Sequence, residues 1–156
     1  MDHAVSIRPA VAEDVGALLA LFRESVRGLG AEFYTPEALE AWSAGLDEPR
    51  LRGLLRTTFV LAAELDGELA GFGALDSDLL EMLYVHPLHA HRGVATVLLA
   101  AIEAEALRRG ARTLSARVSL AAQPFFKCRG FLMVRGLEVV RSGVEIFCFQ
   151  MEKRLA

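Results

Sequence analysis

Residues 79–109 read LLEMLYVHPLHAHRGVATVLLAAIEAEALRR, an apolar run followed by a short polar turn and a longer apolar segment. The first part, Leu79 to Val85, is broken only by Glu81 and has about the length of a strand buried on both faces. From Val94 to Leu107, apolar residues recur at three- and four-residue spacing, which predicts an amphipathic helix that ends at Gly110. The stretch is therefore predicted to form a strand, a turn and a helix.

The turn between this strand and this helix has the features of a phosphate-binding site. Gly93 has no side chain to block a ligand, and Arg92 beside it is cationic. The first N–H groups of a helix lack intrahelical partners and carry partial positive charge. An ordinary connection between strand and helix is the alternative interpretation. The residues expected to contact a phosphate or pyrophosphate are His91, Arg92, Gly93, Val94, Ala95 and Thr96.

The segment Ala90 to Ala95 resembles the acetyl-coenzyme A (acetyl-CoA) signature of the GNAT superfamily, the GCN5-related N-acetyltransferases. That signature follows a strand and reads Gln/Arg-x-x-Gly-x-Gly/Ala. Gly93 and Ala95 match it, whereas Ala90 stands where Gln or Arg is usual. This departure removes one polar side chain but none of the backbone donors.

A second segment, Ser119 to Phe131, reads SLAAQPFFKCRGF and resembles the later GNAT motif Asn-x-x-Ala-x-x-Phe-Tyr-x-x-x-Gly-Phe. The matches are Ala122, Phe125, Gly130 and Phe131. Two motifs in the family's order and at about its spacing argue against a chance match. The resemblance covers most of the chain and implies an enzyme, an acetyl-CoA-dependent N-acetyltransferase with the GNAT fold.

The composition suits one domain, 1–156, because 156 residues with 53% hydrophobic content can bury a substantial core. The 17 basic and 20 acidic residues are interspersed and give a net charge of −3, so nucleic acid is not an expected partner. No apolar run approaches the roughly 18 residues of a membrane span, and no signal-peptide pattern is present. Two cysteines, Cys128 and Cys148, form no disulfide framework, which fits a cytoplasmic protein.

Strand and helix patterns predict a mixed α/β (α+β) fold, with a central sheet of about six to seven strands flanked by helices. Asp66-Gly67 is a strong signal for a tight hairpin turn, and Thr35-Pro36 has the residues of a helix start. Strands are expected at 5–8, on both sides of the hairpin turn within 58–76, and at 79–85, 112–119, 133–140 and 145–153. Helices are expected from Asp14 to Gly28 and Gly30, and at 35–42, 48–56, 94–109 and 121–127.

Glu81 is the candidate general base. Strand alternation predicts that Glu81, Leu83 and Val85 share one face and that Leu80, Met82 and Tyr84 share the other. A carboxylate in an apolar row has a raised pKa, which suits proton transfer near neutral pH, directly or through water. The resemblance implies the same role, since many GNAT members carry an acidic residue on this strand. A carboxylate paired with a nearby Arg is the structural alternative.

The general acid is less evident, because Phe126 stands where the GNAT motif has its Tyr. The candidates to replace that Tyr as proton donor are water, Tyr84, Tyr34 and the Cys128 thiol, unless no acid is needed. Tyr84 is therefore counted with Glu81 as a catalytic candidate. Cys128 as a covalent nucleophile lacks an obvious His base and is more simply a small apolar residue.

The resemblance also implies how acetyl-CoA is held. Where neighbouring strands splay apart, the backbone of Leu83, Tyr84 and Val85 would pair with the amides of pantetheine. Ser119 would touch the pantetheine arm, and Phe125 and Phe126 would line the other side, although aromatic residues at this spacing are also common in cores. No metal is expected, since His86, His89 and His91 do not have a zinc-site spacing.

The acceptor is predicted to be an amine of a small molecule or, as second choice, of a protein. By resemblance, the N-terminal helices cover the acceptor site, so Tyr34 and Trp42 are candidates to line it. A GNAT-fold sensor that holds acyl-CoA without turnover is the alternative function. The protein is expected to be a monomer or a homodimer joined through apolar residues 144–151.

Overall fold

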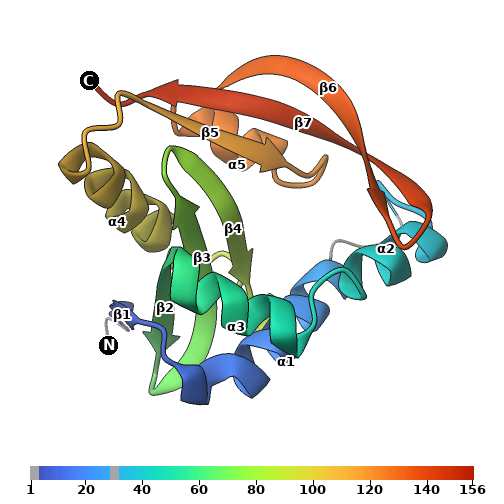
Figure 1. Cartoon of the computed structure of the whole chain (residues 1–156), viewed down its shortest axis with the longest axis horizontal. Coiled ribbons are helices and arrows are strands. Elements are labelled where there is room, and N and C mark those ends of the chain that lie inside the picture. Colours follow the sequence, from blue (N-terminus) through green and yellow to red (C-terminus); the bar gives the residue numbers. More distant parts are fainter. Residues whose placement is uncertain (1–3, 29–31) are drawn as a thin grey trace.

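The computed structural model describes residues 4–28 and 32–156, and its centre is a seven-stranded mixed sheet. Its strands are β1 (Ser6–Pro9), β2 (Phe59–Leu65), β3 (Glu68–Asp76), β4 (Leu79–Val85), β5 (Thr113–Val118), β6 (Leu132–Arg141) and β7 (Val144–Arg154). The order is β1-β2-β3-β4-β5-β7-β6. Neighbours are antiparallel except β4 and β5, and Figure 1 shows β5, β6 and β7 grouped apart from β1 to β4. The predicted mixed α/β class and strand number are confirmed.

Helices cover both faces of the sheet through two apolar clusters. The helices are α1 (Val15–Arg27), α2 (Pro36–Ser43), α3 (Glu48–Thr57), α4 (Val94–Arg108) and α5 (Gln123–Cys128). Helices α1 and α3 pack on one face against Phe72 and Met82, whereas α4 packs on the other against Leu75 and Leu80. Gly30, expected to help end the first helix, lies outside the described residues. No helix within 4–28 and 32–156 is long and apolar enough to cross a membrane.

The local signals behave as expected. The Thr35 hydroxyl caps α2 by accepting the Ala38 N–H at 3.1 Å, and Asp47 caps α3 in the same way. Asp66 and Gly67 join β2 to β3 with φ angles of 55° and 78°, the left-handed pair that a tight hairpin requires. These contacts explain why the predicted boundaries agree closely with the observed ones.

Two glycines on β3 allow α4 to lie directly on the sheet. A Cβ atom at Gly73 would lie 2.5 Å from Ile102 Cδ1, and one at Gly71 would lie 2.9 Å from Val94 Cγ1. Both distances are shorter than carbon atoms tolerate, so a side chain at either position would displace Ile102 or Val94. The two glycines therefore allow the close packing of α4 on β3.

A β-bulge at Glu81 makes the predicted alternation along β4 wrong. Ala74 pairs with Met82, but the next residue of β3 pairs with Leu80, so Glu81 is an extra residue. Beyond the bulge the faces exchange: Leu80 shares the α4 cluster with Leu83 and Val85, while Met82 and Tyr84 pack on the α1 side. The bulge turns Glu81 toward α3, where it lies near Arg50.

Strands β4 and β5 pair over only two positions. The register joins Leu79 to Ser115 and Leu80 to Ala116, and within the described residues it goes no further. Beyond this point β5 continues beside β7 while β4 continues beside β3, so the two halves of the sheet diverge (Figure 1). The β5-facing edge of β4 therefore presents backbone groups without a strand partner, as the sequence analysis expects.

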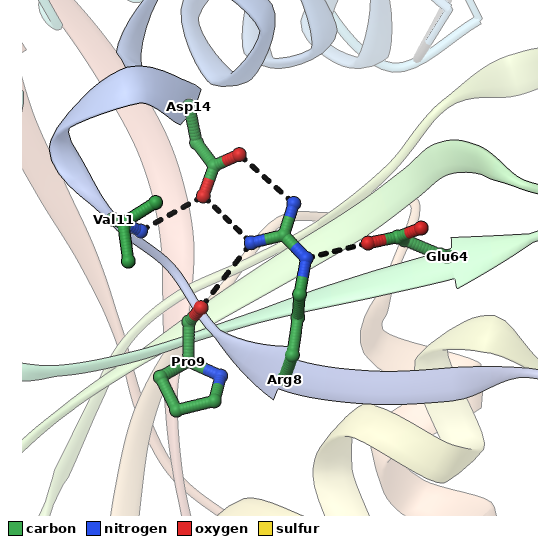
Figure 2. Close-up of polar contacts among 5 residues, drawn as sticks. All are labelled: Arg8, Pro9, Val11, Asp14 and Glu64. Atoms are coloured by element: carbon green, nitrogen blue, oxygen red, sulfur yellow. Dashed lines mark hydrogen bonds and ion pairs between the residues drawn. The ribbon is translucent and has the colours of Figure 1, made fainter.

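An arginine holds the N-terminal strand to the first helix and to the sheet. Figure 2 shows Arg8 between two carboxylates: its Nη atoms donate to Asp14 at 2.8 and 2.9 Å, and its Nε donates to Glu64 on β2. Asp14 also accepts the Val11 N–H at 2.8 Å. Hydrogen bonding to the arginine lowers the pKa of Asp14. The ionised carboxylate thus stabilises the folded state.

Replacing Arg8 with Ala should lower the free energy of unfolding by about 1–2 kcal/mol at neutral pH, because both carboxylates lose a donor. The Asp14 contribution is present above the unfolded pKa, about 4, and is lost as the pH falls through the lower folded pKa. The difference between wild type and R8A in urea unfolding should therefore shrink below about pH 4.

The matched control is Arg23→Ala, which removes an exposed guanidinium from α1. It should change the unfolding free energy by less than about 0.5 kcal/mol. An equal loss in both variants, or a loss in R8A that is constant down to pH 3, would contradict a stabilising role for this cluster.

Candidate active site

The turn after β4 places a helix N-terminus beside the end of that strand. A short 3₁₀ turn, Pro87–His89, is followed by His91 and Gly93 in left-handed conformation, with φ of 61° and 84°. Helix α4 starts at Val94, and its first backbone bond joins the Val97 N–H to the Gly93 carbonyl. The three preceding N–H groups have no partner within the helix. The predicted phosphate-binding turn thus has a donor arrangement that suits an anion.

The side chains of this turn differ in how accessible they are to a ligand. Val94 is buried in the core, so only its N–H is available to a ligand. His91 and Thr96 are exposed, and Ala95 is partly buried. The Nη2 atom of Arg92 lies 3.2 Å from Asp66 Oδ2 on the β2–β3 turn. This ion pair holds Arg92 next to the turn.

Arg129 is a cation that the sequence analysis missed. Its Nη2 donates to Thr96 Oγ1 at 2.6 Å, and its guanidinium lies 3.8 Å from the centroid of the Phe125 ring. The cation therefore lies beside the first turn of α4. The available signal was its place four residues after Phe125, directly after a short helix, since a spacing of four residues puts two side chains on one side of a helix.

Two hollows adjoin where β4 and β5 separate. One opens toward α5 and is lined by Val118, Ala122 and Phe126, among others; we call it the α5-side hollow. The other lies against the α2–α3 segment and is lined by Phe22, Arg50 and Ile146, among others; we call it the α3-side hollow. The residues common to both are Trp42, Leu80, Glu81, Met82, Tyr84, Arg117 and Ser119.

Glu81 lies in this shared lining and is partly exposed, with 22% of its side chain accessible. Its Oε1 lies 3.6 Å from Arg50 Nη2 on α3. This pairing with an arginine is the alternative that strand periodicity left open. A partly exposed carboxylate at the junction of two hollows can reach a ligand in either of them.

Tyr84 also lies in the shared lining, with its hydroxyl on the α1 side of the sheet. That hydroxyl accepts a hydrogen bond from Trp42 Nε1 at 3.2 Å, and its ring meets Phe22 edge-on at 4.8 Å. Burial raises the pKa of Tyr84 to about 12, so the phenol stays protonated at neutral pH. Trp42 and Tyr84, two of the predicted site residues, thus lie in contact, and their roles in the site stay a prediction.

Tyr34 lies elsewhere, outside the lining of both hollows. Its hydroxyl donates to the Phe147 carbonyl and accepts the Leu120 N–H, each at 2.9 Å. These bonds tie the start of α2 to β7 and to the loop after β5. The observed contacts of Tyr34 hold parts of the fold together. Its contact with an acceptor stays a prediction.

The second motif lines the α5-side hollow. Ser119 Oγ accepts the Ala122 N–H at 3.1 Å, which fixes the loop that leads into α5. Phe126 is buried and meets both Phe125 and Phe131 edge-on. Phe126 and Tyr84 line the same hollow, so the only phenol there comes from β4 among the described residues.

The two cysteines differ. Cys128 is exposed at the end of α5. Cys148 on β7 is buried and lines the α3-side hollow, and burial raises the pKa of its thiol. No sequence pattern around Cys148 predicts a place in the site.

Known proteins resemble this chain in sequence and in fold. The family model of the acetyltransferase (GNAT) domain matches residues 31–155. YafP of Escherichia coli K12, an uncharacterized N-acetyltransferase, is 30% identical over 94% of each chain. A GCN5-related N-acetyltransferase from Rhodopseudomonas palustris superposes with a TM-score of 0.94, with 34% identity over 99% of this chain and 98% of that one.

A second solved structure shares the fold at lower identity. It is the paia N-acetyltransferase of Thermoplasma acidophilum in complex with coenzyme A, with a TM-score of 0.81 and 23% identity over 97% of this chain and 99% of that one. The family model spans most of the sequence, and the more similar relatives cover nearly all of it. The chain therefore belongs to the GNAT family of N-acetyltransferases.

Proposed function

We propose that this protein transfers the acetyl group of acetyl-CoA to an amine at the junction of the two hollows. The observation that carries the proposal is the early separation of β4 from β5, with Glu81 and Tyr84 at the point of separation. A thioester entering from the α5 side and an amine entering from the α3 side would meet there. Family membership and the coenzyme A complex of the Thermoplasma relative support the cofactor.

Acetyl-CoA would bind along the unpaired edge of β4. The amides of pantetheine can pair with the backbone of Leu83, Tyr84 and Val85 as an added strand does. The pyrophosphate would lie at the start of α4, where free N–H groups and Arg92 meet it and Arg129 lies close by. Ser119, Phe125 and Phe126 would then line the pantetheine arm from the other side.

The reaction is direct attack of the amine nitrogen on the thioester carbonyl. Holding both reactants in one place supplies much of the rate enhancement, and backbone N–H groups at the separation stabilise the developing oxyanion. The amine proton passes to the Glu81 carboxylate, directly or through a water molecule. The carbon–sulfur bond breaks, and the coenzyme A thiolate leaves.

Tyr84 is the proposed donor to that thiolate, in place of the Tyr that Phe126 replaces. Its phenol is protonated at neutral pH, and it lines the α5-side hollow together with Phe126. The hydrogen bond from Trp42 occupies an acceptor position of the hydroxyl and leaves its proton free to be donated.

The acceptor is proposed to be an amine of a small molecule, and less readily of a protein. Trp42 and Tyr84 wall one side of the α3-side hollow, while Val139 and Ile146 of β6 and β7 wall another. Such enclosure suits a small ligand. We place the reaction in the cytoplasm, in a monomer or a homodimer.

A sensor that binds acyl-CoA without turnover is the second candidate. The observation that favours it is the aromatic side chain without a hydroxyl at Phe126. Both functions require cofactor binding, so only a chemical step separates them. Release of coenzyme A thiol in the presence of an amine is the assay that distinguishes a transferase from a sensor.

Replacing Glu81 with Gln should lower kcat by about 100-fold or more, because Gln keeps the size but cannot accept the proton. The affinity for acetyl-CoA, measured by calorimetry, should stay within about twofold, since binding rests on backbone and phosphate contacts. The control is Glu145→Gln, an exposed carboxylate in the β6–β7 region. Equal kcat values for E81Q and E145Q would exclude Glu81 as the base.

Replacing Tyr84 with Phe should lower kcat about 10- to 100-fold while keeping the ring contacts with Phe22. The wild-type rate should not fall from ionisation of Tyr84 up to about pH 10, because its pKa is about 12. An unchanged kcat in Y84F would assign the proton to water instead.

A spectroscopic titration tests the protonation of Tyr84 directly. The protein has two tyrosines, and burial raises the pKa of both Tyr34 and Tyr84. Each folded pKa lies above the unfolded value near 10, so the folded state favours the protonated tyrosines. Their contribution to the free energy of unfolding is therefore fully present below about pH 10 and is lost as the pH rises above it. Phenolate absorbance should therefore begin at a higher pH in the folded than in the unfolded protein, and that of Tyr84 should appear only well above pH 10 or together with unfolding. Folded and unfolded protein that titrate at the same pH would contradict the burial of these hydroxyls.

A further inference from the structure

The α3-side hollow has an excess of positive charge. Three of the side chains that line it are guanidinium groups and only one is a carboxylate. Its remaining titratable groups, a phenol and a thiol, are neutral at physiological pH because burial raises the pKa of each. The titratable residues of the lining are Arg50, Glu81, Tyr84, Arg117, Arg141 and Cys148.

Two of these cations meet at one backbone segment. Arg50 donates from Nη1 to the Gly45 carbonyl at 2.6 Å, between α2 and α3. The side chain of Arg141, at the end of β6, lies against the same residue: a Cβ atom at Gly45 would be 3.2 Å from Arg141 Cδ. Arginines from two distant parts of the chain therefore both lie against Gly45 at the wall of the hollow.

The third cation lies at the point of strand separation. Arg117 follows Ala116, the last β5 residue that pairs with β4, and it lines both hollows together with Glu81. Arg50 has Glu81 as a counter-ion at 3.6 Å. Neither Arg117 nor Arg141 forms an ion pair with a carboxylate within residues 4–28 and 32–156; Arg141 donates only to the Val140 carbonyl. Among the described residues, two guanidinium groups at the hollow thus have no carboxylate partner.

We infer that the acceptor is an amine that also carries an anionic group, bound by Arg117 and Arg141 while its amine lies at Glu81. This inference rests on the proposed acetyltransferase function and narrows its acceptor. Guanidinium groups bind carboxylates and phosphonates through paired, charge-assisted hydrogen bonds. The same two charges repel a polyamine or any other acceptor with a second cationic group.

A carboxylate and a phosphonate share this chemistry, so the test includes both. Thiol release from acetyl-CoA is measured with α-amino acids, their methyl esters, aminoalkylphosphonates and spermidine. For wild type, the kcat/KM for the best anionic amine should exceed that for its neutral counterpart at least tenfold, and spermidine should be a poorer acceptor still. The better of the two anionic classes identifies the group that the arginines bind.

Substitutions of Arg117 and Arg141 test whether these two arginines cause the preference for anionic amines. Arg117→Gln and Arg141→Gln should each raise the KM for the anionic amine about 10- to 100-fold and leave the neutral amine within about threefold. Acetyl-CoA affinity should not change in R141Q, because Arg141 lines the α3-side hollow and not the α5-side hollow. Arg112→Gln removes an exposed guanidinium at the far end of the β5 region and should match wild type in every measurement.

The outcomes distinguish failure of the anionic-acceptor inference from failure of the proposed acetyltransferase function. Turnover with neutral amines or spermidine equal to that with anionic amines would overturn the inference and leave the transferase intact. A preference for anionic amines that survives both substitutions would also overturn it. Acetyl-CoA binding without thiol release from any acceptor would refute the transferase itself, and the inference with it.

Discussion

The early end of pairing between β4 and β5 is the constraint on which the rest of the site depends. Two strands that paired along their whole length would satisfy each other's backbone groups and leave nothing for a ligand. Here the register stops at Leu80 and Ala116, so β4 keeps an open edge while the sheet stays continuous at its base. The separation also creates both hollows, because each is lined from the two strands that part.

The bulge at Glu81 determines which way this carboxylate points where the two strands separate. An unbroken strand would have placed Glu81 on the same face as Leu83 and Val85, against the apolar cluster under α4. The extra residue instead turns the carboxylate toward α3 and Arg50, next to the α3-side hollow. One inserted residue therefore sets which side of the sheet the carboxylate faces, while the two glycines of β3 allow α4 to pack closely on the sheet.

Turns, helix caps and element boundaries could be predicted from the sequence, because they depend on residues that are neighbours along the chain. The Asp66-Gly67 turn, the Thr35 cap and the strand-turn-helix at 79–109 each depend on neighbouring residues, and each is present in the structure. The register of β4 could not be predicted in this way, because the bulge depends on pairing with β3. Likewise, the Tyr34 hydroxyl and the convergence of Arg50 and Arg141 on Gly45 depend on partners far along the chain. The sequence thus indicated which segments line the two hollows but not which way several of their side chains face.

The most direct test of the account is amide hydrogen exchange, followed by mass spectrometry, with and without acetyl-CoA. If pantetheine adds to the open edge of β4 and the pyrophosphate lies at the start of α4, exchange should slow in residues 81–85 and 94–97. It should stay unchanged in β1, which lies at the far edge of the sheet. Unchanged exchange along β4 at saturating acetyl-CoA would show that the separated strands do not hold the cofactor, and would contradict the central claim.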